Sequence, residues 1–248
     1  MPDEFSRKET LISKYKYLIF DVDDTLLNFY AAFKSAQTAI AEKLNIAYSK
    51  EYMELDEKCG WKAWKESDLD NTNSLDIQKN YHTYYYQYVR NHYIHLLQEL
   101  QMSADVDELV DCYLTTVTAS KVLMEKNTLQ VYETLSKHYR LTLATNGVNP
   151  MQTERVSAFL PFTHKLYVSE SIGYIKPTKD FFQYIIQDLS CKPEECLMIG
   201  DSLTNDIIGA SFIGMDVCYY NPRRKKKPDD ITIHYEIQSI EELVNILL

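Results

Sequence analysis

In the second half of the chain, short apolar runs alternate with amphipathic segments. The apolar runs cover residues 141–145, 165–168, 196–199 and 216–220. Between two of these runs, Phe182, Ile185, Ile186 and Leu189 have the i, i+3, i+4, i+7 spacing of one helical face. Strands that alternate with helices predict an α/β fold with a doubly wound, parallel sheet.

One earlier apolar run, residues 17–20, leads directly into Asp21. The next predicted strand begins at Leu141, roughly 120 residues later, which is far more than a strand–helix–strand crossover requires. Between Asp3 and Asn146, Gly60 is the only glycine and proline is absent, so this stretch is predicted to be mostly helical. We expect an inserted all-helical domain over residues 29–123 and an α/β core over 1–28 and 124–248. The helices are predicted near 29–44, 51–66, 77–100 and 106–124.

Composition and charge exclude several classes of protein. The 248-residue chain is 45% hydrophobic and 25% charged, which is typical of globular proteins. Its 36 acidic residues outnumber its 26 basic residues, giving a net charge of -10. Because nucleic-acid binding depends on clustered Lys and Arg, we expect no nucleic-acid partner. The basic run 223–227 lies between two prolines and is predicted to be a solvated loop, with no role that the sequence identifies.

The sequence also contains no signal for a membrane or for export. No apolar run approaches the roughly 20 residues that span a bilayer, and residues 1–15 are too polar for a signal peptide. We therefore expect a cytoplasmic protein without a membrane partner. The five cysteines are an odd number without Cys-x-x-Cys spacing, which predicts reduced thiols and no zinc site.

Acidic residues follow the first apolar run directly, at Asp21, Asp23 and Asp24. Three neighbouring carboxylates repel one another unless a cation binds, and oxygen ligands favour a hard divalent metal. The same D-x-D-x-T pattern recurs at residues 68–72, but no buried strand precedes it, so we interpret that copy as a polar turn between helices. The copy at Asp21 follows a strand, and open α/β sheets bind ligands at the carboxyl ends of their strands.

Two more predicted strands end in polar residues, and a lysine stands between them. Because parallel strands end at one edge of the sheet, these side chains are predicted to lie near Asp21. The residues are Thr145 and Asn146 before Gly147, Lys176 before Pro177, and Asp201 after Gly200, followed by Asn205 and Asp206.

Together, these four motifs resemble those of the haloacid dehalogenase (HAD) superfamily of phosphohydrolases. The resemblance covers nearly the whole chain, because the helical insertion is similar to the helical cap of that superfamily. Residues 145–147, 169–177 and 199–206 look like the branch of pyrimidine 5'-nucleotidases, which act on nucleoside monophosphates. N-acylneuraminate-9-phosphatases look similar in the same segments, so the substrate stays open.

The resemblance implies a Mg²⁺-dependent phosphomonoester hydrolase that forms an aspartyl-phosphate. It assigns Asp21 as the nucleophile and Asp23 as the acid and base. Mg²⁺ would be bound by the carboxylates of Asp21 and Asp201 and by the backbone carbonyl of Asp23. The substrate phosphate would be held by Lys176, the Thr145 hydroxyl, and backbone N–H groups near Asn146 and Gly147. Behind these groups, Asp206 would orient Lys176 or a metal-bound water, and Asp24 and Asn205 would be further members of the site.

Other functions fit parts of this pattern. Dehalogenases of the superfamily lack an acid at the position of Asp23, so its presence favours phosphoryl chemistry. A phosphatase of small sugar phosphates and a sugar phosphomutase remain enzymatic alternatives. A receiver domain, which is a signalling module phosphorylated on aspartate, is about half as long and carries its phosphorylated residue on a later strand.

The helical insertion is rich in aromatic residues, with Trp61, Trp64 and six tyrosines between Tyr81 and Tyr93. These rings could stack on a nucleobase, pack in the interior of the insertion, or form a homodimer contact. The i, i+3 pair of His92 and His95 could bind a metal or lie at the surface as polar residues.

Overall fold

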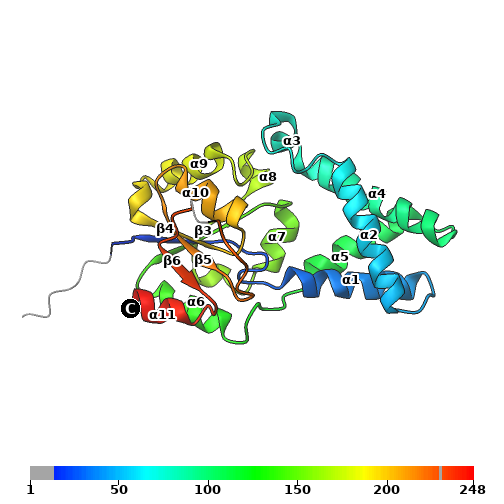
Figure 1. Cartoon of the computed structure of the whole chain (residues 1–248), viewed down its shortest axis with the longest axis horizontal. Helices are drawn as coiled ribbons and strands as arrows, with labels where there is room; N and C mark the ends of the chain where they lie inside the picture. Colours follow the sequence, from blue (N-terminus) through cyan, green and yellow to red (C-terminus); the bar gives the residue numbers. More distant parts are fainter. Residues whose placement is uncertain (1–13, 229–230) are drawn as a thin grey trace, which may run out of the picture.

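A computed structural model describes residues 14–228 and 231–248. Its core is a six-stranded, parallel sheet with the strand order β3-β2-β1-β4-β5-β6 (Figure 1). The predicted α/β fold with a doubly wound, parallel sheet is therefore confirmed. The strands are β1 (Tyr17–Phe20), β2 (Arg140–Thr145), β3 (Thr163–Val168), β4 (Cys196–Gly200), β5 (Asp216–Tyr220) and β6 (Tyr235–Ile237).

Helices cover both faces of this sheet. Successive residues of β1 point to opposite faces. Leu18 and Phe20 pack in one hydrophobic cluster with α6 (Thr128–Ser136) and α11 (Glu242–Leu247). Ile19 packs in another cluster with α9 (Lys179–Leu189). The shorter helical segments are α7 (Asn149–Arg155), α8 (Ser169–Ile172), α10 (Gly209–Ser211), the 3₁₀ turns Leu160–Phe162 and Pro193–Glu195, and the π-helical turn Leu203–Ile208.

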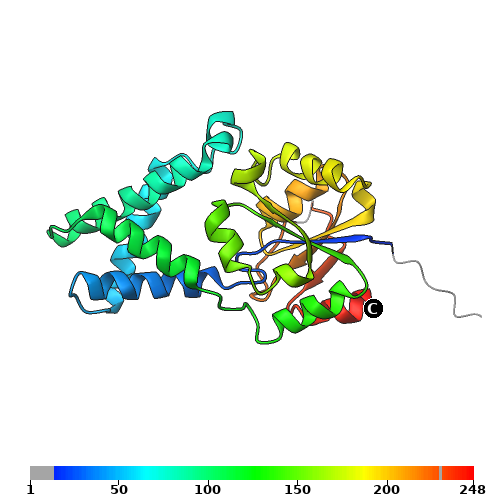
Figure 2. The same ribbon diagram turned by 180° about the vertical axis from the view of Figure 1, so that it is seen from behind.

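Five helices lie together to one side of the sheet (Figures 1 and 2). They pack around their own cluster of buried residues, with α2 against α4 and α1 against α5. Helix α5 also contacts α7 of the core. We propose on this basis that residues 29–123 form a cap domain. The helices are α1 (Phe29–Lys43), α2 (Lys50–Glu66), α3 (Leu75–Lys79), α4 (Tyr81–Leu100) and α5 (Val106–Ala119).

The two segments that join these helices to the core pair with each other. The Asn28 N–H donates to the Val122 carbonyl at 2.8 Å, and the Met124 N–H donates to the Leu26 carbonyl at 2.9 Å. The helix predicted to reach Met124 therefore ends earlier, at Ala119, because residues 122–124 hydrogen-bond across the linkers instead of along a helix.

Two other predictions about elements are corrected. The helix expected over 77–100 is interrupted at Asn80, which separates α3 from α4 and whose side-chain amide donates to Asp76 Oδ1 at 2.8 Å. Such local side-chain bonds compete with the helical backbone. Strand β6 was not predicted, because it has only three residues and a polar centre, Glu236. It adds to the sheet by pairing with β5.

Three simpler expectations hold, for residues 68–72, for the cysteines and for the basic loop. Residues 68–72 lie in the connection between α2 and α3. Asp68 has a left-handed backbone there, and the Asn71 side-chain amide donates to Asp68 Oδ2 at 3.0 Å. All five cysteines are free. Residues 222–228 are exposed. Among the described residues, no helix combines the length and apolar character needed to cross a bilayer.

Candidate functional site

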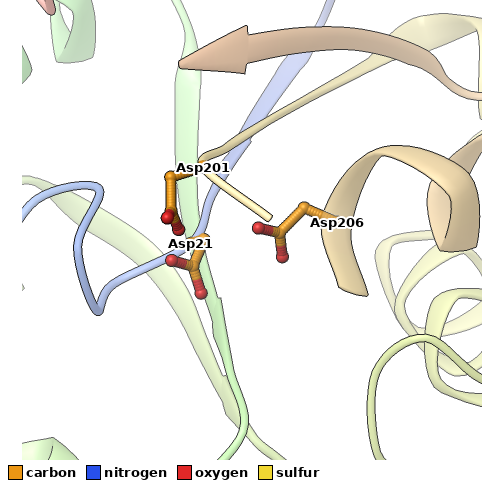
Figure 3. A group of neighbouring side chains, drawn as sticks. All are labelled: Asp21, Asp201 and Asp206. Carbon is orange, nitrogen blue, oxygen red and sulfur yellow. The ribbon is translucent and has the colours of Figure 1, made fainter. Parts of the chain in front are cut away.

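Three carboxylates meet at the carboxyl edge of the sheet. Asp21 follows β1, Asp201 follows β4, and Asp206 belongs to the π-helical turn beyond it. One oxygen from each lies within 4.8 Å of the others, and Figure 3 shows the side chains gathered together. The strand ends thus bring Asp21 close to two carboxylates that lie 180 or more positions later in the sequence.

Gly200 makes this close approach possible. A Cβ atom at residue 200 would lie 2.3 Å from Asp206 Oδ2, which is far inside contact distance. Asp206 Oδ2 is itself fixed, because it accepts the Ser202 N–H at 3.0 Å. The Asp201 N–H donates to Thr25 Oγ1 at 3.1 Å and so ties β4 to the loop after β1. Only glycine at residue 200 leaves room for the side chain of Asp206, six residues later.

Lys176 is the buried cation of this group. Its ammonium donates to Asp21 Oδ1 at 2.5 Å and to Asp206 Oδ1 at 2.7 Å, and the residue is 3% exposed. Asn146 holds the lysine backbone: its Oδ1 accepts the Lys176 N–H at 2.8 Å, and its Nδ2 donates to the Lys176 carbonyl at 3.0 Å. The side chain of Asn146 therefore positions Lys176. The Gly147 N–H, predicted to bind the phosphate, instead donates to Ser169 Oγ at 2.9 Å.

The electrostatics of the group favour a bound cation. Burial raises the pKa of Asp21, and Lys176 opposes this effect only in part because Asp206 and Asp201 raise the pKa as well. Burial, Asp206 and Asp24 together raise the pKa of Asp201 to about 7. Burial disfavours the Lys176 ammonium, but Asp206 and Asp21 outweigh it, so its pKa is raised and it stays charged at neutral pH. One lysine does not offset the repulsion among the three carboxylates. A hard divalent cation, which prefers oxygen ligands, would offset the rest, so these residues fit such a metal.

Asp23 points away from these carboxylates, toward α7. Its Oδ1 accepts from Arg155 Nη1 at 2.5 Å, and its Oδ2 accepts from Gln152 Nε2 at 2.7 Å. The same Gln152 nitrogen donates to Thr145 Oγ1 at 2.8 Å. Helix α7 thus connects the predicted acid to the predicted phosphate-binding hydroxyl.

The sequence analysis missed both α7 residues. Gln152 and Arg155 are each 1% exposed, and an arginine is normally buried only with a partner, which here is Asp23. A Cβ at Gly147 would lie 2.8 Å from Gln152 Cγ, so the loop after β2 packs tightly on this helix. The i, i+3 spacing of two polar residues just after Asn146 and Gly147 was the only available signal, and it is weak.

Asp24 and Asn205 shape the backbone around the carboxylates. Asp24 has a left-handed φ of 60°, and its Oδ1 accepts the Phe29 N–H at 3.0 Å, at the start of α1. The Asn205 N–H donates to Ser202 Oγ at 3.1 Å in the π-helical turn. The Asp24 contact favours a structural role for its side chain, whereas the Asn205 contact involves only the backbone.

A cavity of about 540 Å³ opens between Asp24 and the cap helices. Within the cavity wall, the described residues include three carboxylates, of Asp24, Glu57 and Asp70, and neither lysine nor arginine. Trp61 is 66% exposed and its ring is accessible. The aromatic residues of the wall are Phe29, Tyr30, Phe33, Trp61, Trp64, Tyr85, Tyr88 and Tyr113.

The tyrosines of the aromatic cluster have different surroundings. Tyr85 and Tyr88 line the cavity, whereas Tyr93 is 1% exposed inside the cap and Tyr81 packs in the same buried cluster.

The two histidines of α4 also have different surroundings. His92 is 1% exposed, so its prediction as a surface residue is wrong, and its Nε2 contacts Asp56 Oδ1 at 2.9 Å. His95 contacts Glu66 at 2.6 Å. Neither belongs to the carboxylate group, the one cluster in residues 14–228 and 231–248 whose geometry could hold a metal ion.

The chain was compared with known families and proteins. Residues 15–214 match the model of a family described as haloacid dehalogenase-like hydrolase. YfnB of Bacillus subtilis, named a HAD-hydrolase, is 31% identical over 95% of this chain and 97% of its own length. Its magnesium-bound crystal structure has a TM-score of 0.79 at 30% identity, with 94% of this chain and 98% of that chain covered.

Two further relatives are named as a nucleotidase and as a phosphatase. The pyrimidine 5'-nucleotidase PynA of Streptococcus pneumoniae is 27% identical, with 94% of this chain and 95% of that protein covered. The N-acylneuraminate-9-phosphatase of Rattus norvegicus is 24% identical, with 95% of each covered.

Proposed function

Because the chain belongs to the haloacid dehalogenase-like hydrolases, we propose that it hydrolyses phosphate monoesters through a phosphoaspartate on Asp21, with Mg²⁺ as its metal. The predicted family and the predicted hydrolase class are confirmed, and a nucleotidase and a phosphatase are among the relatives. The observation that carries the proposal is Asp21 itself, buried between two further carboxylates and in contact with one buried lysine.

The carboxylates of Asp21 and Asp201 would hold Mg²⁺, and Asp206 lies close enough to contribute. The bound metal supplies positive charge that offsets repulsion between the carboxylates and an anionic phosphate. The magnesium-bound structure of YfnB supports this choice of metal.

The chain's own residues would carry the two chemical steps. A carboxylate oxygen of Asp21 forms a bond to phosphorus while the bond to the leaving oxygen breaks, and Asp23 gives that oxygen a proton. A water then attacks the same phosphorus, Asp23 takes its proton, and the bond to Asp21 breaks to release phosphate. Lys176 and the Thr145 hydroxyl would bind the phosphate oxygens, while Gln152 keeps Asp23 beside Thr145.

We further propose that the substrates are nucleoside 5'-monophosphates with pyrimidine bases. The aromatic cavity has a volume typical of small-molecule sites, and its rings could stack on a base. Stacking contributes about 1 to 3 kcal/mol, which corresponds to roughly a fivefold to 150-fold gain in kcat/KM. Its three carboxylates would repel an acidic leaving group such as an N-acylneuraminate. A small-molecule phosphomonoester is thus the proposed partner, while the homodimer and the cytoplasmic location stay predictions.

The nucleophile is tested by Asp21→Asn with p-nitrophenyl phosphate and Mg²⁺. The wild-type enzyme should release p-nitrophenol, and the variant should lose turnover because an amide neither attacks phosphorus nor adds charge to the metal site. Asp68→Asn is the matched control, since Asp68 begins the second D-x-D-x-T copy outside the site. Activity of the Asp21 variant within tenfold of wild type would contradict the assignment.

The substrate is tested by a panel of phosphorylated metabolites, with release of inorganic phosphate as the readout. Pyrimidine nucleoside 5'-monophosphates should have a kcat/KM at least fivefold higher than that of hexose phosphates. The opposite preference would favour a sugar-phosphate phosphatase. Isomerisation of a sugar phosphate with little phosphate release would instead identify a phosphomutase.

A further inference from the structure

The basic run 223–227 forms a fixed loop after β5. The buried side chain of Asn221 binds the backbone of Lys225 in this loop. Its Oδ1 accepts the Lys225 N–H at 2.8 Å, and its Nδ2 donates to the Lys225 carbonyl at 3.0 Å. The Asn221 N–H donates to the Ile237 carbonyl at 2.7 Å, which anchors the loop to β6. The positions of the basic residues are therefore set by a buried side chain.

Two of these cations are used within the surrounding structure. Arg224 Nε donates to Gln238 Oε1 at 3.1 Å, and Lys227 forms an ion pair with Glu236. In the part of the chain that the structure describes, neither contact involves the edge of the sheet where Asp21, Asp201 and Asp206 lie.

Arg223 and Lys225 are placed differently. They line a cavity of about 50 Å³ together with Asp24 and Asp201. Both are exposed, so an anion in solution can reach them. Such a volume is larger than the space that one water needs, so a small ion or several waters can enter between these cations and the carboxylates.

Cations at the edge of the sheet that holds Asp21 would attract the substrate, because a phosphate dianion approaches a strongly acidic protein. The chain has a net charge of -10, and the buried Lys176 is already in contact with two carboxylates. Charge at the rim of a site changes the rate at which an ionic substrate is captured, by tenfold or more in favourable cases.

We propose that Arg223 and Lys225 form an anion-binding entrance beside Asp201, which captures the phosphate group of the substrate from solvent. The inference rests on the proposed function, because it assumes that phosphate reacts at Asp21. The two cations act on capture and on phosphate affinity, and the chemical steps at Asp21 do not involve them. They raise kcat/KM and leave kcat unchanged.

The test compares two double variants that remove equal charge from the same loop. Arg223→Gln with Lys225→Gln removes the cations that line the cavity, and Lys226→Gln with Lys227→Gln is the control. Both are assayed with p-nitrophenyl phosphate at low and high salt, with Mg²⁺ saturating because charge beside Asp201 also affects metal binding. Binding of inorganic phosphate with Mg²⁺ is measured by calorimetry on the same proteins.

The first variant should lose roughly fivefold or more in kcat/KM at low salt, with kcat within about twofold of wild type. At about 0.5 M salt its loss should fall below about twofold, since screening confines the field to a few ångströms. Phosphate should bind to it several-fold more weakly, and the control should behave as wild type.

An equal loss in both variants, a loss in kcat, or a loss that salt does not reduce would each overturn the proposal. The proposed function fails in a different way. In that case, the wild-type protein itself would neither hydrolyse the ester nor bind phosphate.

Discussion

Lys176→Met removes the one buried cation between Asp21 and Asp206 and keeps a side chain of similar length. The two carboxylates would then be buried without the lysine. Breaking a buried ion pair by removing one partner costs about 3 to 5 kcal/mol of unfolding free energy. For a protein of this size, each kcal/mol lowers Tm by roughly 2 to 4 °C, so we expect a decrease of about 6 to 20 °C.

This loss should depend on pH in a definite direction. Burial already raises the pKa of Asp21, and without the opposing effect of Lys176 it rises further in the folded protein. In the unfolded chain the same carboxyl has a pKa near its ordinary value of about 3.9. The folded variant therefore binds protons more tightly than the unfolded chain, so its stability increases as pH falls from 7 toward 5. The Tm difference from wild type should shrink accordingly.

The assay is thermal unfolding by circular dichroism in metal-free buffer at about pH 7.5 and pH 5.5. Lys165→Met is the matched control, because Lys165 forms an exposed ion pair with Asp188 at 2.6 Å. Exposed pairs contribute less than about 1 kcal/mol. If Lys176→Met melted like the control at both pH values, the reasoning about a buried, charged lysine would be refuted.

Three further variants test other parts of the site. Gly200→Ala should lower kcat roughly 10- to 100-fold, because the new Cβ would displace Asp206, and steady-state kinetics checks this. Gln152→Leu leaves Asp23 with Arg155 alone and breaks its connection to Thr145, so it should slow alkyl phosphates about tenfold more than p-nitrophenyl phosphate, whose leaving group needs little protonation; equal losses on both would contradict it. Trp61→Ala should lower kcat/KM for pyrimidine nucleotides about fivefold without changing Tm or the rate with p-nitrophenyl phosphate.

The carboxylate edge could be predicted because its signals are local. An apolar run that ends in Asp21 or in Gly200 and Asp201 identifies a strand end, and parallel strands end at the same edge. The place of Asp206 beside Lys176 was implied by the family resemblance, which left a metal-bound water as the alternative partner.

The remaining features depend on contacts between distant residues. Arg155 is 132 positions from Asp23, and nothing in its neighbourhood distinguishes it from a surface arginine of a helix. The end of α5 at Ala119 depends on pairing between the two linkers. Similarly, Arg223 lines the cavity beside Asp201 because Asn221 binds the backbone of the loop at Lys225.

The central claim is that phosphate is transferred to Asp21. The most direct measurement is a reaction with a substrate that the enzyme turns over, stopped during turnover and treated with borohydride. This reagent reduces an aspartyl-phosphate to homoserine, which is then located by peptide mass spectrometry. We predict homoserine at residue 21 in the wild-type protein, dependent on substrate, and none in Asp21→Asn. Substrate-dependent reduction at another aspartate, or rapid turnover without any modified residue 21, would contradict the account.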